Sequence, residues 1–156
     1  MKFSDVIIAT ASLLLLGLIL NAFFLVAFGS LSASSMSDVL ATIVSGLVTS
    51  LIVGYVFASE IQEESRIKAI GVIVVLSGFA LLIFMTIWMA TPFAYPWMQD
   101  SLNSMFNKTT LQWTDYDLNA YAALADAIEV IMGIVISFIG LYIGSMLRKP
   151  SAKTKE

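Results

Sequence analysis

Four long apolar segments alternate with short polar segments along the chain. Residues 6–28, 39–59, 69–90 and 119–147 consist mainly of Leu, Ile, Val, Phe, Ala and Met, with few charges. A helix needs about 20 such residues to cross the hydrocarbon core of a bilayer, and each segment reaches that length. The pattern therefore predicts an all-α fold, an integral membrane bundle of four transmembrane helices.

The composition agrees with this pattern and leaves no room for a separate soluble domain. Of the 156 residues, 59% are hydrophobic and 12% are charged, with a mean hydropathy of +0.92. Soluble domains contain about 45–50% apolar and about 25% charged residues. The first segment exceeds the roughly 7–15 apolar residues of a signal peptide, so we expect a retained helix. Residues 1–156 should form a single membrane domain.

The distribution of Lys and Arg predicts the orientation in the membrane. An even number of crossings puts both termini on one side, which then carries seven of the eight basic residues. These are Lys2, Arg66, Lys68, Arg148, Lys149, Lys153 and Lys155. The other side carries Lys108 and several aspartates. Because cytoplasmic loops are enriched in Lys and Arg, we expect a multi-pass protein with both termini cytoplasmic, ending in a basic tail over residues 148–156.

The longest connection, residues 92–118, is predicted to lie outside and to contain a short amphipathic helix. In PWMQDSLNSMFNK, apolar residues recur at helical spacing, as in helices that lie in the membrane interface. Four aromatic residues are expected interfacial anchors: Tyr95, Trp97, Trp113 and Tyr116. A role as a partner-docking or lid element is the alternative. Asn107 begins an Asn-Lys-Thr glycosylation sequence and is a glycosylation candidate.

Asp126 and Glu129 lie where the fourth segment should enter the hydrocarbon. Counting about 20 residues back from Arg148 places this boundary near residue 128. One interpretation is an acidic helix start, stabilised by the helix dipole. The other is a cation- or proton-sensitive cluster at the outer end of the bundle. Its candidate polar partners are Asn21, Thr86 and Thr91.

Small residues recur along one face of two of the predicted helices. In the second segment these are Thr42, Gly46, Ser50 and Gly54. In the fourth segment, Gly133, Ser137, Gly140 and Gly144 continue a stripe that begins with Asn119, Ala122, Asp126 and Glu129. Such faces let helix backbones approach closely in lipid. They predict tight packing, either within the chain or against another chain.

Absent residue types limit the chemistry. The chain has no Cys and no His, which excludes thiol catalysis, disulfides, thiolate zinc sites and His-ligated haem. We find no catalytic constellation, and we expect no metal, no cofactor and no nucleic-acid partner. The expected partners are the lipid bilayer and other membrane subunits or a second copy of the chain. The sequence favours an accessory or scaffolding subunit of a membrane complex; a small oligomeric cation or proton channel using Asp126 and Glu129 is the alternative.

Overall fold

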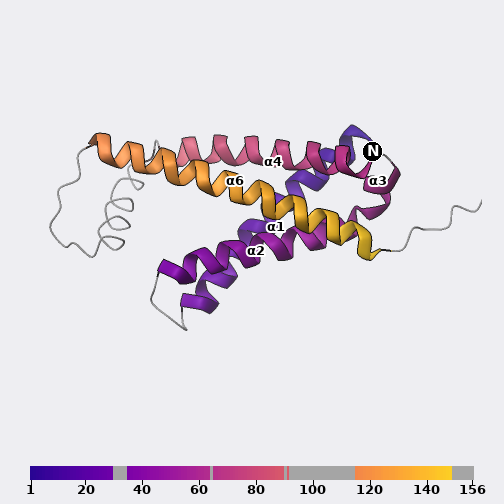
Figure 1. Ribbon diagram of the computed structural model, residues 1–156, viewed down its shortest axis with the longest axis horizontal. Helices are drawn as coiled ribbons and strands as arrows, with labels where there is room; N and C mark the ends of the chain where they lie inside the picture. Colours follow the sequence, from indigo (N-terminus) through magenta and orange to yellow (C-terminus); the bar gives the residue numbers. More distant parts are fainter. Residues whose placement is uncertain (30–34, 64, 90, 92–114, 149–156) are drawn as a thin grey trace, which may run out of the picture. The chain divides into compact units, whose positions relative to one another are not determined.

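The protein is built from helices, as seen in the computed structural model (Figure 1). The structure describes residues 1–29, 35–63, 65–89, 91 and 115–148, and these contain helices and no strands. The helices are α1 (Phe3–Gly29), α2 (Ser35–Val56), α3 (Ala58–Glu63), α4 (Arg66–Met89) and α6 (Asp115–Leu147). The predicted all-α fold is therefore confirmed.

Four of the described helices are long and apolar enough to cross a membrane. The qualifying stretches are Phe3–Phe28, Val39–Val56, Arg66–Trp88 and Ala127–Leu147. Each corresponds to one predicted segment, which makes this a small multi-pass integral membrane protein. The predicted outer loop and basic tail, including Tyr95, Trp97, Asn107 and Trp113, lie largely outside the described residues, so the amphipathic helix stays a prediction.

The second crossing ends three residues earlier than the predicted 39–59. α2 stops at Val56, and α3 follows after a turn at Phe57, whose N–H donates to the carbonyl of Val53 at 2.9 Å. The N–H of Ile61 in turn donates to the carbonyl of Phe57 at 3.0 Å. The chain after α2 therefore continues the helical hydrogen bonding.

The chain divides into two compact units, which are described separately. The first comprises Met1–Ser77 and Gly133–Glu156, and the second comprises Gly78–Met132. Because α4 and α6 each contribute to both, the first unit holds the N-terminal half of α4 and the C-terminal half of α6. The first unit contains every described residue of α1, α2 and α3.

α1 and α2 form an antiparallel pair in the first unit (Figure 1). Buried apolar side chains from all its helices form one core, which consists of Val6, Ala9, Leu13, Val53, Ile61, Ala69, Ile70, Ile73, Val74 and Leu141. The aromatic side chains of Phe57 and Phe138 pack against this core. In lipid this packing holds the helices together mainly by close contact, since the surrounding acyl chains are equally apolar.

Candidate functional site

The predicted acidic pair lies in the second unit, near the start of the last crossing. Glu129 is exposed, whereas its neighbour Val130 is buried. Asp126 belongs to α6, and its side chain lies outside what the structure describes, as does that of Tyr116. That Asp126 and Glu129 point into the bundle or toward a partner therefore stays a prediction.

The three predicted polar partners of this pair each make a hydrogen bond of their own. The hydroxyl of Thr86 donates to the carbonyl of Leu82 at 2.8 Å, and that of Thr91 donates to the carbonyl of Trp88 at 2.7 Å. Such bonds to the preceding helical turn satisfy a hydroxyl within its own helix. Asn21 instead belongs to the first unit and accepts a hydrogen bond there. The cation- or proton-sensitive cluster of Asp126 and Glu129 with these polar residues stays a prediction.

The small residues of α2 and the C-terminal half of α6 are brought together in the first unit. A Cβ atom at Gly140 would collide with the side chain of Ser50, whose Cβ lies 2.7 Å away. A Cβ at Gly54 would lie 2.5 Å from the carbonyl oxygen of Leu141. Glycine at these positions therefore permits an approach of the two helices that any larger residue prevents.

Two further glycines of this contact show how it continues along the helices. At Gly144 a Cβ would collide with the carbonyl of Leu51 and lie 3.0 Å from the backbone nitrogen of Tyr55. At Gly46 the nearest atom would be a methyl carbon of Ile136, at 3.4 Å. The two helices are therefore tightly packed at Gly140, Gly54 and Gly144, and less tightly at Gly46.

The other end of the small-residue stripe on α6 is open. A Cβ at Gly133 would meet no atom of the described residues within 4 Å, and Gly133 and Ser137 are only half-buried. On α2, Thr42 is exposed even though Gly54 and Ser50 are buried. The predicted stripe is therefore closed by a neighbouring helix along part of its length and uncovered along the rest.

A second polar seam, which the sequence analysis did not identify, runs between α1 and α2. The Ser45 hydroxyl donates to Asn21 Oδ1 at 3.4 Å and to the carbonyl of Thr42 at 3.0 Å. One turn further along, Thr49 is buried and would contact a Cβ on Gly17 at 3.9 Å. The Oγ1 atoms of Thr49 and Thr10 are both buried without a hydrogen-bond partner among the described residues.

The two faces of α2 explain this arrangement. Residues 45, 49 and 53 lie on the face toward α1, and residues 46, 50 and 54 lie on the face toward α6. Successive residues of a helix point about 100° apart, so two neighbouring columns can serve two neighbouring helices. The four-residue spacing of Ser45, Thr49 and Val53 is the sequence signal that could have identified the second column.

Polar side chains close the ends of α2 and α6 where both helices finish. Gln62 Nε2 donates to the carbonyl of Ser145 at 2.7 Å and to that of Arg148 at 3.4 Å. A guanidinium nitrogen of Arg148 donates to the carbonyl of Val56 at 3.1 Å. These bonds satisfy terminal carbonyls that the helices themselves leave unpaired. They also connect α3 to α6, and α6 to α2, at this end of the first unit.

The described residues contain no group of three or more acidic side chains close enough to hold a metal ion. Comparisons of the chain with known protein families, with curated proteins and with solved structures found no match. The site must therefore be interpreted from its own geometry.

Proposed function

We propose that this small multi-pass membrane protein is an accessory or scaffolding subunit that holds another membrane chain through the open end of its α6 stripe. The observation that carries the proposal is the contrast between Gly140 and Gly133. The first is closed against Ser50, while a Cβ on the second would meet no atom within 4 Å in the part of the chain that the structure describes. A small-residue face on a membrane helix is suited to close contact with another helix, not to contact with acyl chains.

The polar residues beside this open stretch support the same proposal. Glu129, one turn before Gly133 in α6, is exposed at the start of the Ala127–Leu147 crossing. A carboxylate near the membrane boundary costs less than one at the bilayer centre, yet it favours a polar contact over lipid. Ser137, one turn further on, is half-buried and offers a hydroxyl on the same side of the helix.

The proposed orientation places both termini in the cytoplasm. It rests on the seven basic residues that four crossings bring to one side, against Lys108 on the other. In this orientation Glu129 and Gly133 lie toward the outer face, where the partner helix would contact α6. The Gln62 and Arg148 helix caps lie toward the cytoplasmic face.

Replacement of Gly133 by leucine should release the partner without unfolding the subunit. The full chain is purified from its native membrane in a mild detergent, and the chains that co-purify are quantified by mass spectrometry. Gly71→Leu is the matched control, because a Cβ at Gly71 of α4 also meets no described residue within 4 Å. We expect a stoichiometric companion with the original chain and with Gly71→Leu. With Gly133→Leu the affinity for the companion should fall about tenfold, which corresponds to about 1.4 kcal/mol of lost packing.

Two outcomes would contradict the subunit proposal. The first is a companion that survives Gly133→Leu while both variants keep the helical content of the original chain. The second is a homo-oligomer with no companion whose cation flux in liposomes falls when Glu129 is replaced by glutamine. That result would favour the channel alternative, in which Asp126 and Glu129 select the ion.

A further inference from the structure

We propose that an open pocket at the end of the first unit binds the phosphate group of an anionic phospholipid. The pocket has a volume of about 360 Å³ and is lined by Gln62, Ser65, Arg66, Ile67 and Tyr142. Four of these residues offer polar groups, and Arg66 supplies a positive charge. The chemical class that fits is a phosphate monoanion attached to a lipid, with its acyl chains alongside the neighbouring apolar surface.

The position of the pocket along the helices matches the depth of lipid headgroups. Arg66 is the first residue of the Arg66–Trp88 crossing. Tyr142 lies five residues before Leu147, the last residue of the Ala127–Leu147 crossing, a rise of about 7.5 Å along the helix. Tyr side chains favour this interfacial zone. Ile67 lines the pocket and is 64% exposed, so it gives an acyl chain an apolar surface next to the charged group.

The geometry of Arg66 leaves it suited to phosphate. Its guanidinium carbon lies 5.7 Å from the centre of the Tyr142 ring, which places the cation over the aromatic face. An arginine held by its planar face keeps its N–H groups at the edge of that plane, in the fork that pairs with two phosphate oxygens. Arg66 is half-buried and packs against Tyr142. Its side chain therefore has less conformational freedom to lose when a ligand binds.

The remaining polar groups around the pocket have fixed roles. Gln62 donates to the carbonyls of Ser145 and Arg148, which holds one wall of the pocket in place. The backbone carbonyl of Ser65 accepts from the N–H groups of Lys68 at 2.8 Å and Ala69 at 3.1 Å, which positions the start of α4. Arg148 itself donates to the end of α2. Arg66 is therefore the cation that lines the pocket.

A nearby acidic residue argues against a purely diffuse attraction. Glu60 precedes the pocket in sequence, and its carboxylate accepts a hydrogen bond from the Ser59 hydroxyl at 2.8 Å. This carboxylate offsets part of the local positive charge. Binding of an anionic headgroup should consequently depend on the placement of Arg66, and less on the summed charge of this end of the protein.

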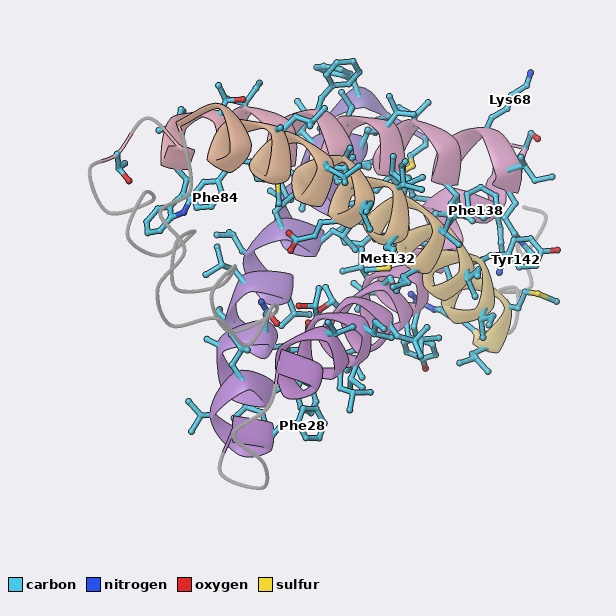
Figure 2. The ribbon with its side chains drawn as sticks, turned by 60° about the vertical axis from the view of Figure 1, so that its left-hand side comes forward. Phe28, Lys68, Phe84, Met132, Phe138 and Tyr142 are labelled. Atoms are coloured by element: carbon cyan, nitrogen blue, oxygen red, sulfur yellow. The ribbon has the colours of Figure 1, made fainter. Side chains whose placement is uncertain are left out.

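The decisive comparison is between Arg66 and Lys68. Lys68, in α4, is exposed and points away from the protein (Figure 2). Tyr142, in α6, lies at the same end of the first unit. Arg66→Gln and Lys68→Gln change the net charge equally, but only Arg66 lines the pocket. The full chain in neutral detergent is titrated with fluorescent phosphatidylglycerol, with phosphatidylcholine and inorganic phosphate as comparison ligands.

We expect phosphatidylglycerol to bind and phosphatidylcholine to bind more weakly. Arg66→Gln should weaken the binding of phosphatidylglycerol about fivefold, the factor that corresponds to about 1 kcal/mol per basic residue near an anionic lipid surface. Lys68→Gln should leave it within about twofold, since screening weakens exposed charges. Ser65→Asp supplies a second test, because aspartate is as well suited as serine to the position before a helix, and it adds a negative charge at the pocket. It should reduce binding at least as much as Arg66→Gln.

Three results would overturn the proposal. Equal losses in Arg66→Gln and Lys68→Gln would show diffuse attraction. Equal binding of phosphatidylcholine and phosphatidylglycerol would show that the pocket does not select an anionic headgroup. Full competition by inorganic phosphate at the lipid's own concentration would show a site for a free anion, not for a lipid. Should Arg66→Gln fail to fold, retained binding in a folded Ser65→Asp variant would still refute the site.

Discussion

A single methyl group at Gly144 is expected to destabilise the folded protein by about 3 kcal/mol, the upper end of the range for overpacking. In the first unit, a Cβ at this position collides with the carbonyl of Leu51 and lies 3.0 Å from the nitrogen of Tyr55. Both are backbone atoms, which cannot rotate away as a side chain can. The two helices must instead separate, which loosens the contact of Gly54 with Leu141.

The measurement is the free energy of unfolding of Gly144→Ala in mixed micelles, with helical content as the signal. Gly133→Ala is the matched control, because it adds the same methyl group to the same helix at a position where none of the described atoms lies within 4 Å. Alanine is the better helix former by up to about 1 kcal/mol, so this variant should be neutral or slightly more stable. Equal destabilisation by both variants would show that α2 and α6 do not approach as described.

The neighbouring position offers a reciprocal test of the same contact. Gly140→Ala places its methyl group against the side chain of Ser50, not against backbone. Adding Ser50→Gly removes the colliding side chain, so the double variant should regain most of the stability that Gly140→Ala loses. Coupling between two residues in contact typically amounts to about 0.5–3 kcal/mol. Simple additivity of the two changes would contradict the contact.

Replacement of Thr49 by valine should stabilise the protein by about 1–2 kcal/mol, because an unpaired buried hydroxyl carries a penalty of about 1–3 kcal/mol. Thr49 is 1% exposed, and its Oγ1 has no hydrogen-bond partner among the described residues. Valine fills nearly the same volume with a methyl group. The expected gain is therefore the removed desolvation cost, measured as the change in unfolding free energy in mixed micelles.

The hydroxyl of Ser45, one turn away, provides the contrast. It donates to Asn21 and to Thr42, so Ser45→Ala should lose stability by about 0.6 kcal/mol, the average for a hydrogen bond between membrane helices. The prediction is thus a difference in sign between two hydroxyls on one face of α2. A loss of stability in Thr49→Val would show that its hydroxyl is paired in the membrane, as a hydrated path along α1 and α2 would require.

The sequence predicted the helices well because their length is set by the thickness of the bilayer. The apolar run of residues 69–90 closely matches α4, and residues 6–28 closely match α1. The end of α2 falls three residues before the end of the predicted segment, because the apolar run continues through Phe57 and Ala58 past the turn at Phe57. Hydropathy shows which residues tolerate lipid, but it does not show where one helix ends and the next begins.

The candidate site was less predictable for a geometric reason. A spacing of four identified Gly46, Ser50 and Gly54 as one face, but it could not say which helix closes that face. The adjacent column of Ser45 and Thr49 has the same spacing, but it contains no glycine and so gives a weaker sequence indication of close helix packing. Contacts such as that between Gln62 and Ser145 join residues 83 positions apart, and only the packing of the helices reveals them.

Cysteine labelling tests the central claim, that the chain crosses the membrane four times with both termini in the cytoplasm. The chain contains no cysteine, so single cysteines at Ser4, Asn103 and Ser151 report three sites without background. With an impermeant thiol reagent on intact cells, Asn103→Cys should react at once, while Ser4→Cys and Ser151→Cys should react only after permeabilisation. Labelling of either terminal cysteine in intact cells, or protection of Asn103→Cys, would contradict the account.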